Sequence, residues 1–279
     1  MDLSISKKIS TIERDYITDL LAHGTRLDGR GFLEYREIKV DAGPMLKADG
    51  SARVFLGTTQ SCVGVKYETG RPFPETPNEG VVTAMAELVP FASPMYESGP
   101  PDENAIELAR VVDRGIRHSD IIEKSKLVLV PGEEVFLLYV DIYYIMHNGN
   151  PWDASSLAAL CALKSTMIPP LENQEVMGKK YLVPVGDPQP LGIQDYPVTI
   201  TFAKIGENLI VDPGLMEELI SDARISFCIN KNSLITSMQK NGSGTFTTDE
   251  LIKCAKNARD LAPALQQIAK DYERDLTNM

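Results

Sequence analysis

Apolar residues at the start of the chain recur at the spacing of an amphipathic helix. Because a helix completes a turn every 3.6 residues, this spacing gathers them towards one face. Gly24 follows, at the point where a left-handed residue commonly ends a helix. The pattern predicts an N-terminal helix and turn within residues 1–30, without the apolar core of a signal peptide. The apolar positions are Ile5, Ile9, Ile12, Ile17, Leu20 and Leu21.

Alternating and β-branched residues then predict strands separated by glycine and proline turns. The expected strands lie at 36–40, 52–68 (two strands joined at 57–59), 81–92, 126–130 and 135–146. Helices are expected at about 100–118 and 151–167, and the proline-rich residues 71–80 are expected to form a loop. That loop is long enough to serve a function, although most such loops only connect elements.

The second half repeats this order in shorter form. Strands are expected at 180–185, 196–205 and 208–214, a short helix at 216–223, a hairpin at 224–240 that turns at 230–232, and a helix at 247–276. Since strands come in runs and helices follow them, an α+β or split βαβ architecture is favoured over a doubly wound parallel sheet. The expected domains are 31–170 and 191–279, and the weakly periodic residues 171–190 are the predicted linker.

Composition and charge indicate a globular protein and argue against one that binds nucleic acid by itself. The chain has 279 residues, of which 43% are hydrophobic and 24% are charged, as is typical of a globular protein. Its formal net charge is −11, which opposes stand-alone binding of nucleic acid because phosphates require a positive field. An RNA-binding role therefore requires a local cluster of arginine or lysine, or a basic partner.

The cysteines do not indicate a metal site. They are Cys62, Cys161, Cys228 and Cys254, and no two of them form a CxxC pair. Four reduced, mostly buried thiols in a soluble cytoplasmic protein are the simplest interpretation. No stretch approaches the roughly 20 apolar residues of a membrane span. No metal and no cofactor are expected.

Three arginines on the predicted helix at 100–118 are the strongest candidate for chemistry. Arg110, Arg114 and Arg117 stand at i, i+4 and i+7, so they share one face. Guanidinium groups bind phosphates bidentately, so this stripe suits an RNA backbone. The structural alternative is a solvated face in which Glu107 pairs with Arg110, and Asp113 with Arg117, at helical spacing.

The turn before the helix at 151–167 is a weaker candidate. A loop that leads into a helix N-terminus commonly binds an anion, but Pro151 removes a backbone N–H and Asp153 adds a negative charge there. Asn150 is expected to cap this helix, and Trp152 to anchor packing or an interface. The scattered residues His23, His118 and His147 have no nucleophile motif beside them, and we expect structural or surface roles for them.

Three segments resemble the RNase PH family of phosphate-dependent exoribonucleases, and within it the non-catalytic ring subunit of the archaeal exosome. They are RLDGRGFLEYREI, GRPFPETPNEG and DENAIELARVVDRGIR, and the similarity extends over nearly the whole chain. The resemblance implies an RNase PH-like fold whose core is similar to domain 2 of ribosomal protein S5, with a second, smaller α/β domain. It implies RNA-binding roles for Arg110, Arg114 and Arg117.

The resemblance also implies partners. They are a catalytic RNase PH-like subunit that alternates with this chain in a hexameric ring, RNA-binding cap subunits on one face of the ring, and single-stranded RNA threaded through the channel. The expected role is therefore to structure the partner's active site and to bind the RNA backbone during 3'-to-5' degradation and processing. Such binding should be independent of RNA sequence and sensitive to salt.

Two departures from the active members indicate a chain that does not cut RNA itself. Active members carry an Asp six residues before a second Asp, whereas here Gln189 stands six residues before Asp195. They also carry a Gly-Thr/Ser-Arg turn for phosphate, whereas Pro151, Trp152 and Asp153 stand in its place. An amide cannot act as general acid or base.

Two alternatives remain. One is an active phosphorolytic exoribonuclease that uses Asp187 or Asp195. The other is a small-molecule kinase with an S5-like domain, which is disfavoured because no glycine- and serine-rich phosphate loop precedes a helix.

Overall fold

The structure is a computed structural model and describes residues 9–176 and 179–272. Its larger sheet has the order β1-β2-β3-β6-β4, with β5 paired to β6. The bounds are β1 (Ile38–Ala42), β2 (Gly50–Leu56), β3 (Thr59–Gly70), β4 (Val81–Leu88), β5 (Val128–Val130) and β6 (Glu134–Met146). These strands confirm those expected in the first half of the chain, except that the strand expected at 81–92 ends at Leu88 and Pro90–Ala92 form a 3-10 helix.

The smaller sheet is antiparallel and has the order β12-β11-β13-β14. Its bounds are β11 (Val198–Ile205), β12 (Asn208–Val211), β13 (Ala223–Ile229) and β14 (Ile235–Asn241). The predicted hairpin is confirmed, since Asn230 and Leu234 hydrogen-bond across the turn between β13 and β14.

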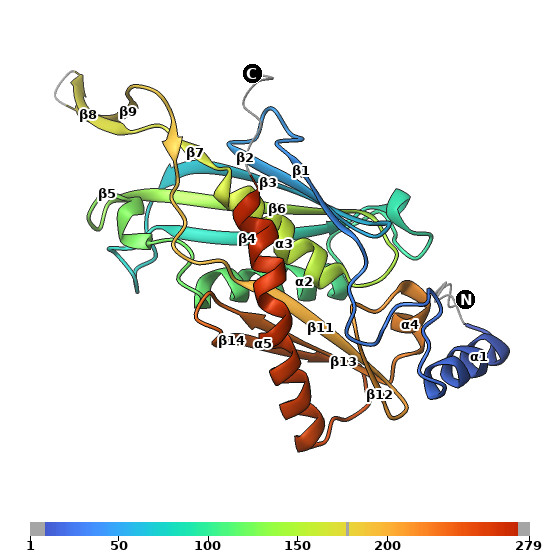
Figure 1. The fold of residues 1–279 in the computed structure, drawn as a ribbon. Helices are drawn as coiled ribbons and strands as arrows, with labels where there is room; N and C mark the ends of the chain where they lie inside the picture. Colours follow the sequence, from blue (N-terminus) through green and yellow to red (C-terminus); the bar gives the residue numbers. More distant parts are fainter. Residues whose placement is uncertain (1–8, 177–178, 273–279) are drawn as a thin grey trace.

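Helices α2 and α3 lie between the two sheets, and α5 covers the far face of the smaller sheet (Figure 1). Helix bounds are α1 (Thr11–Ala22), α2 (Glu103–His118), α3 (Pro151–Lys164), α4 (Leu215–Ile220) and α5 (Thr248–Asp271). Strands β4 and β6 pair in parallel, and α2 lies in the connection between them. The fold is therefore α+β and contains a βαβ unit, as the order of the elements predicts.

Helix α3 is buried on every side because it packs against both sheets. Its sequence is rich in alanine and serine, and these small side chains allow both sheets to approach closely. The serines are bonded within the interior: Ser155 pairs with Ser61 of the larger sheet, and Ser156 with Thr199 of the smaller one. One continuous hydrophobic core thus joins the two halves of the chain. The helix ends at Lys164, slightly earlier than predicted.

The N-terminal helix α1 packs on the second half of the chain. Ser10 and Glu13 form a capping box at its start. Ile17 and Leu21 are buried against a cluster that includes Ile205. Ile12 is 81% exposed, so it does not belong to the buried face that its spacing predicts. Gly24 follows the helix in the left-handed region, as predicted, whereas Ile5 lies outside the described residues.

The segment expected as a linker contains regular structure. Its elements are the hairpin of β8 (Leu171–Val176) and β9 (Lys179–Pro184), and the short strand β10 (Gln189–Pro190), which pairs with β7 (Met167–Ile168). The predicted end of the last helix, beyond residue 272, lies outside the described residues. The division into domains at 171–190 stays a prediction.

Candidate functional site

The arginine stripe lies on α2, where the helix passes along the edge strand β14. The apolar side of α2, which includes Leu108, Val112 and Ile116, is buried in the core. Gly115 lets the helix approach β13, because a Cβ atom there would lie 3.3 Å from the sulfur of Cys228. Packing on both sheets therefore fixes the rotation of α2 and turns its charged face outward.

Arg114 is held by the second half of the chain. Its guanidinium donates to Oε1 of Gln239 on β14 at 2.7 Å, and its Nε donates to the carbonyl of Arg110 at 3.3 Å. The amide of Gln239 in turn donates to Glu107 at 2.8 Å, and the amide of Asn241 donates to the other oxygen of the same carboxylate. Arg114 is half-buried and orientated by these contacts.

Arg110 is exposed, and it differs from Arg114 and Arg117 in how its guanidinium is bonded. Its guanidinium makes no hydrogen bond or ion pair with any residue in the described ranges 9–176 and 179–272. The pairing of Glu107 with Arg110 suggested by the helical spacing is wrong, because Gln239 and Asn241 occupy that carboxylate. The guanidinium of Arg110 therefore remains available for an anion.

Arg117 follows the structural alternative. Its guanidinium is paired with the carboxylate of Asp113 one turn earlier, as the helical spacing predicts. The arginine side chain is still 50% exposed, and such exposed pairs contribute little stability. The three arginines thus share a face, but they differ in how tightly the protein already holds them.

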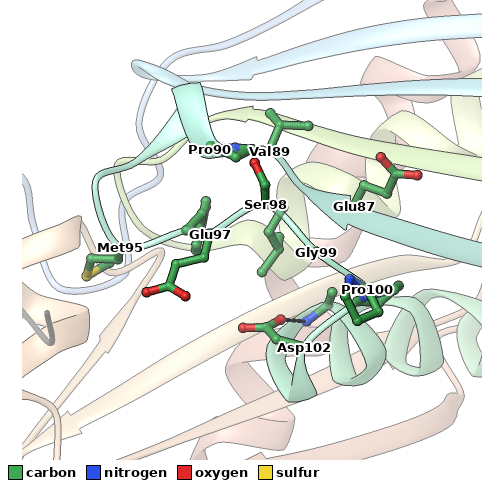
Figure 2. A pocket seen from close by; sticks show the side chains of 13 residues that line it. Glu87, Val89, Pro90, Met95, Glu97, Ser98, Gly99, Pro100 and Asp102 are labelled. Carbon is green, nitrogen blue, oxygen red and sulfur yellow. Dashed lines mark hydrogen bonds between the residues drawn. The ribbon is translucent and has the colours of Figure 1, made fainter. Parts of the chain in front are cut away.

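The other end of α2 is acidic. A cavity of about 580 Å³ lies between the end of β4, the following loop and the start of α2. Figure 2 shows the side chains of Glu87, Glu97 and Asp102 around it, and no Lys, Arg or His contributes to the lining. Asp102 caps the helix by accepting from the amide of Ala105 at 2.8 Å. The negative charge at this end opposes an anion, whereas the other end of α2 carries the arginines.

The turn that leads into α3 is occupied by the chain's own groups. Asn150 caps the helix in the left-handed region, at φ 54°. The carboxylate of Asp153 is buried and accepts from the hydroxyl and amide of Thr201 (2.6 and 3.0 Å), from Tyr35 (2.7 Å) and from Asn150 (2.9 Å). Trp152 is also buried, which confirms a packing role. An anion cannot bind here, because the carboxylate of Asp153 already accepts the hydrogen bonds of these donors.

Asp153 should make the stability of the fold depend on pH. Burial raises the pKa of this carboxyl from 3.8 to about 6, against the hydrogen bonds from Thr201, Asn150 and Tyr35. Between these values the folded chain retains a proton that the unfolded chain has lost, so the free energy of unfolding falls as pH rises. The full effect is about 3 kcal/mol.

The test is Asp153→Asn, which cannot ionise at this position. The difference in unfolding free energy between the natural chain and the variant should fall by most of that amount between about pH 4 and pH 7, as measured by urea denaturation. A difference that does not change over this range would show that the buried carboxyl has an ordinary pKa.

A buried ionic cluster lies beside this turn, and sequence reasoning missed it. Asp212 is 0% exposed and accepts from the guanidinium of Arg36 at 2.6 and 2.9 Å, from Arg30 at 3.0 Å and from Asn150 at 2.9 Å. Burial alone would raise the pKa of Asp212, but hydrogen bonds and attraction to Arg36 outweigh it and hold the pKa below its ordinary value. Both arginines come from the segment that follows the N-terminal helix.

A second carboxylate at the turn is neutralised in the same way. Glu218 accepts from the backbone amide of Asn150 at 2.7 Å and pairs with Arg224. The guanidinium of Arg224 lies over the ring of Trp152, 5.2 Å from its centre. These groups line a cavity of about 330 Å³ together with His147. Glu218 and Arg224 pair with each other, and the carboxylate of Glu107 adds a negative charge to the lining.

Asp212 and Glu218 are six residues apart, the spacing that the resemblance assigns to the acidic pair of active members. The pair noted in the sequence, Gln189 and Asp195, is not near the turn. Gln189 pairs with Ile168 beyond the C-terminal end of α3, whereas the turn lies at the N-terminal end. Since α3 has 14 residues, these ends are about 21 Å apart.

Asp195 is also distant from the turn, and its carboxylate has a structural role. One oxygen accepts from the amides of Tyr196 (2.6 Å) and Lys231 (2.7 Å), which fixes the turn between β13 and β14. Strand β11 begins after Asp195 and reaches the turn at Thr201, and its residues from 198 to 201 alone cover about 10 Å. The structure therefore does not bring Gln189 and Asp195 together with residues 150–153.

The remaining candidates are located as follows. His147 is near Tyr144, whose hydroxyl lies 3.0 Å from its Nδ1, and burial lowers the pKa of the imidazole. His23 and His118 are exposed. All four cysteines are buried and unpaired. The described part of the chain contains no cluster of three metal-binding side chains and no helix that could span a membrane.

The fold and the sequence together define the class of the protein. Residues 34–169 match domain 1 of the 3' exoribonuclease family, the RNase PH domain, and residues 195–260 match domain 2. The chain belongs to this RNase PH family.

Within the family, the chain is similar to proteins named exosome complex component Rrp42. The protein of that name from Thermococcus gammatolerans is 45% identical over 257 residues, which cover 92% of this chain and 93% of the relative. A chain in the structure of the Archaeoglobus fulgidus exosome with RNA bound to the active site is 40% identical, with a TM-score of 0.82 over 92% of this chain and 97% of that one. A chain of an archaeal exosome core is 38% identical, with a TM-score of 0.79 over 93% and 97%.

Proposed function

We propose that this chain is a non-catalytic subunit of an RNA-degrading exosome, in which it binds the RNA backbone for a catalytic partner. The observation that carries this proposal is the arginine face of α2, where Arg110 is exposed and unpaired within the described residues and Arg114 is held beside it. The similarity to exosome components over most of the chain supports the same role.

The ring and its partners are part of the proposal. The chain alternates with a catalytic RNase PH-like subunit in a hexamer, and RNA-binding cap subunits cover one face. An acidic chain of net charge −11 binds RNA weakly alone. In the ring, its arginine face and the partner's groups form one site, and Arg117 adds a contact when RNA displaces Asp113.

The absence of catalysis follows from how the carboxylates are used. Asp212 is surrounded by Arg30, Arg36 and Asn150, and Glu218 by Arg224 and a backbone amide. Neither is free to move a proton, and Asp153 fills the turn where phosphate would bind.

The test compares the chain alone with the chain in the mixed assembly. Single-stranded RNA and inorganic phosphate are added to the purified chain, to the catalytic partner, and to both together. We expect no nucleoside diphosphate from the chain alone, and faster release from the mixture than from the partner alone. Release by the chain alone, abolished by Asp195→Asn or Asp187→Asn, would instead establish it as an active phosphorolytic enzyme.

A further inference from the structure

The contacts between β14 and α2 also concern how the arginine face keeps its charge. Glu107 stands one helical turn before Arg110, at a spacing where opposite charges normally pair. Its carboxylate instead receives amide donors from Gln239 at 2.8 Å and from Asn241, one on each oxygen. Neutral amides satisfy the carboxylate without contributing a positive charge.

The geometry assigns Gln239 and Asn241 as positioning residues for the RNA site: they hold Glu107 away from Arg110, and Gln239 at the same time orientates Arg114. This inference rests on the proposed function, because it concerns the same arginine face. Neither amide needs to touch RNA in order to act.

The direction of the hydrogen bonds fixes the orientation of the Gln239 side chain. Arginine has only donors, so the oxygen of the amide must face Arg114, at 2.7 Å. The nitrogen must then face Glu107, which has only acceptors when ionised. Asn241 donates to the second carboxylate oxygen. Arg114 thus donates to Gln239, and Gln239 and Asn241 donate to Glu107. An acidic residue at 239 would repel Glu107, and a basic residue would repel Arg114.

The position of β14 at the edge of its sheet explains how these amides reach the helix. Strand β14 pairs with β13 on one side only. Gln239 and Asn241 alternate with the exposed Met238 and Lys240, so both amides point to the side where α2 passes. Two side chains from the second half of the chain thereby keep a carboxylate of α2 from pairing with an arginine of the same helix.

The experiment frees Glu107 and then neutralises it. In the assembly with the catalytic partner, Gln239→Ala with Asn241→Ala leaves the carboxylate without its amide donors, and it should turn to Arg110. Binding of a single-stranded RNA of mixed sequence, measured by fluorescence anisotropy without phosphate, should weaken roughly tenfold at low salt. The slope of log Kd against log salt should shrink by about 0.7, the value for one lost ionic contact on a single strand.

Adding Glu107→Gln to this double variant removes the competing charge. We expect the triple variant to recover at least half of the loss in log Kd and the lost salt slope, which a merely structural defect would not do. Gln267→Ala, which removes an exposed amide bound to Asp271 on α5, is the matched control and should bind RNA normally.

Two outcomes would overturn the inference. One is a double variant that binds RNA like the natural chain, and the other is a loss that Glu107→Gln does not restore. If Arg110→Glu with Arg114→Glu weakens binding in the same assay, only the role of the amides is wrong. If that pair of changes has no effect, the proposed function fails as well.

Discussion

Replacing Asp212 by alanine is expected to destabilise the fold by about 3–5 kcal/mol, the range for removing one partner from a buried ionic cluster. The guanidinium of Arg36 would remain nearly buried without its carboxylate, Arg30 would keep Asp28 but lose its second carboxylate, and Asn150 would lose an acceptor. The loss in unfolding free energy is measured by urea denaturation of the purified chain. The substitution should remove the contacts by which Asp212 joins the N-terminal segment, the start of α3 and the end of β12.

Two controls make this result specific. Asp212→Asn keeps the shape but not the charge, so it should lose an intermediate amount of stability. Asp41→Ala removes the carboxylate of a partly exposed pair with Arg53 and should cost less than about 1 kcal/mol. A loss below about 1 kcal/mol for Asp212→Ala would mean that the cluster contributes no more than a surface ion pair.

Periodicity predicted most of the fold because each element is encoded locally. The alternation along β6 and the apolar stripe of α2 are written within single segments, and the arginine stripe follows from helical spacing alone. Helix α3 was predicted for the same reason, although its burial between two sheets is visible only in the folded chain.

The contacts that define the site could not be predicted in this way. The structural alternative paired Glu107 with Arg110, three residues away, but Gln239 binds it from 132 positions further along the chain. Asp212 meets Arg36 across 176 positions, and nothing in the local pattern marks such a pair. Spacing misled in the opposite direction for Gln189 and Asp195, whose separation of six residues matches an active pair while the fold holds them far from the turn.

The second large effect concerns RNA. Changing Arg110 and Arg114 together to glutamate should weaken RNA binding by the assembled ring by at least about 100-fold at low salt, because each charge-assisted bond is worth roughly 1.5–3 kcal/mol. Degradation at limiting RNA should fall in parallel. Arg110 is exposed and Arg114 is half-buried beside β14, but neither belongs to the apolar face of α2, so the fold and the assembly should survive.

The control places the same charge change elsewhere. Lys256 and Arg259 are exposed on α5, on the opposite side of the smaller sheet. Changing both to glutamate alters the net charge by the same amount as changing the two arginines of α2. If negative charge alone weakens RNA binding, the α2 and α5 variants should lose the same affinity. If RNA contacts α2, only the α2 variant should lose affinity.

Salt dependence of RNA binding by the ring therefore tests the proposed role most directly. The assembly is titrated with single-stranded RNA at several salt concentrations, with the natural chain, the α2 variant and the α5 variant. Loss of two phosphate contacts should reduce the salt slope by about 1.4 in the α2 variant alone. Equal slopes and affinities in all three assemblies would show that Arg110 and Arg114 do not touch the RNA backbone.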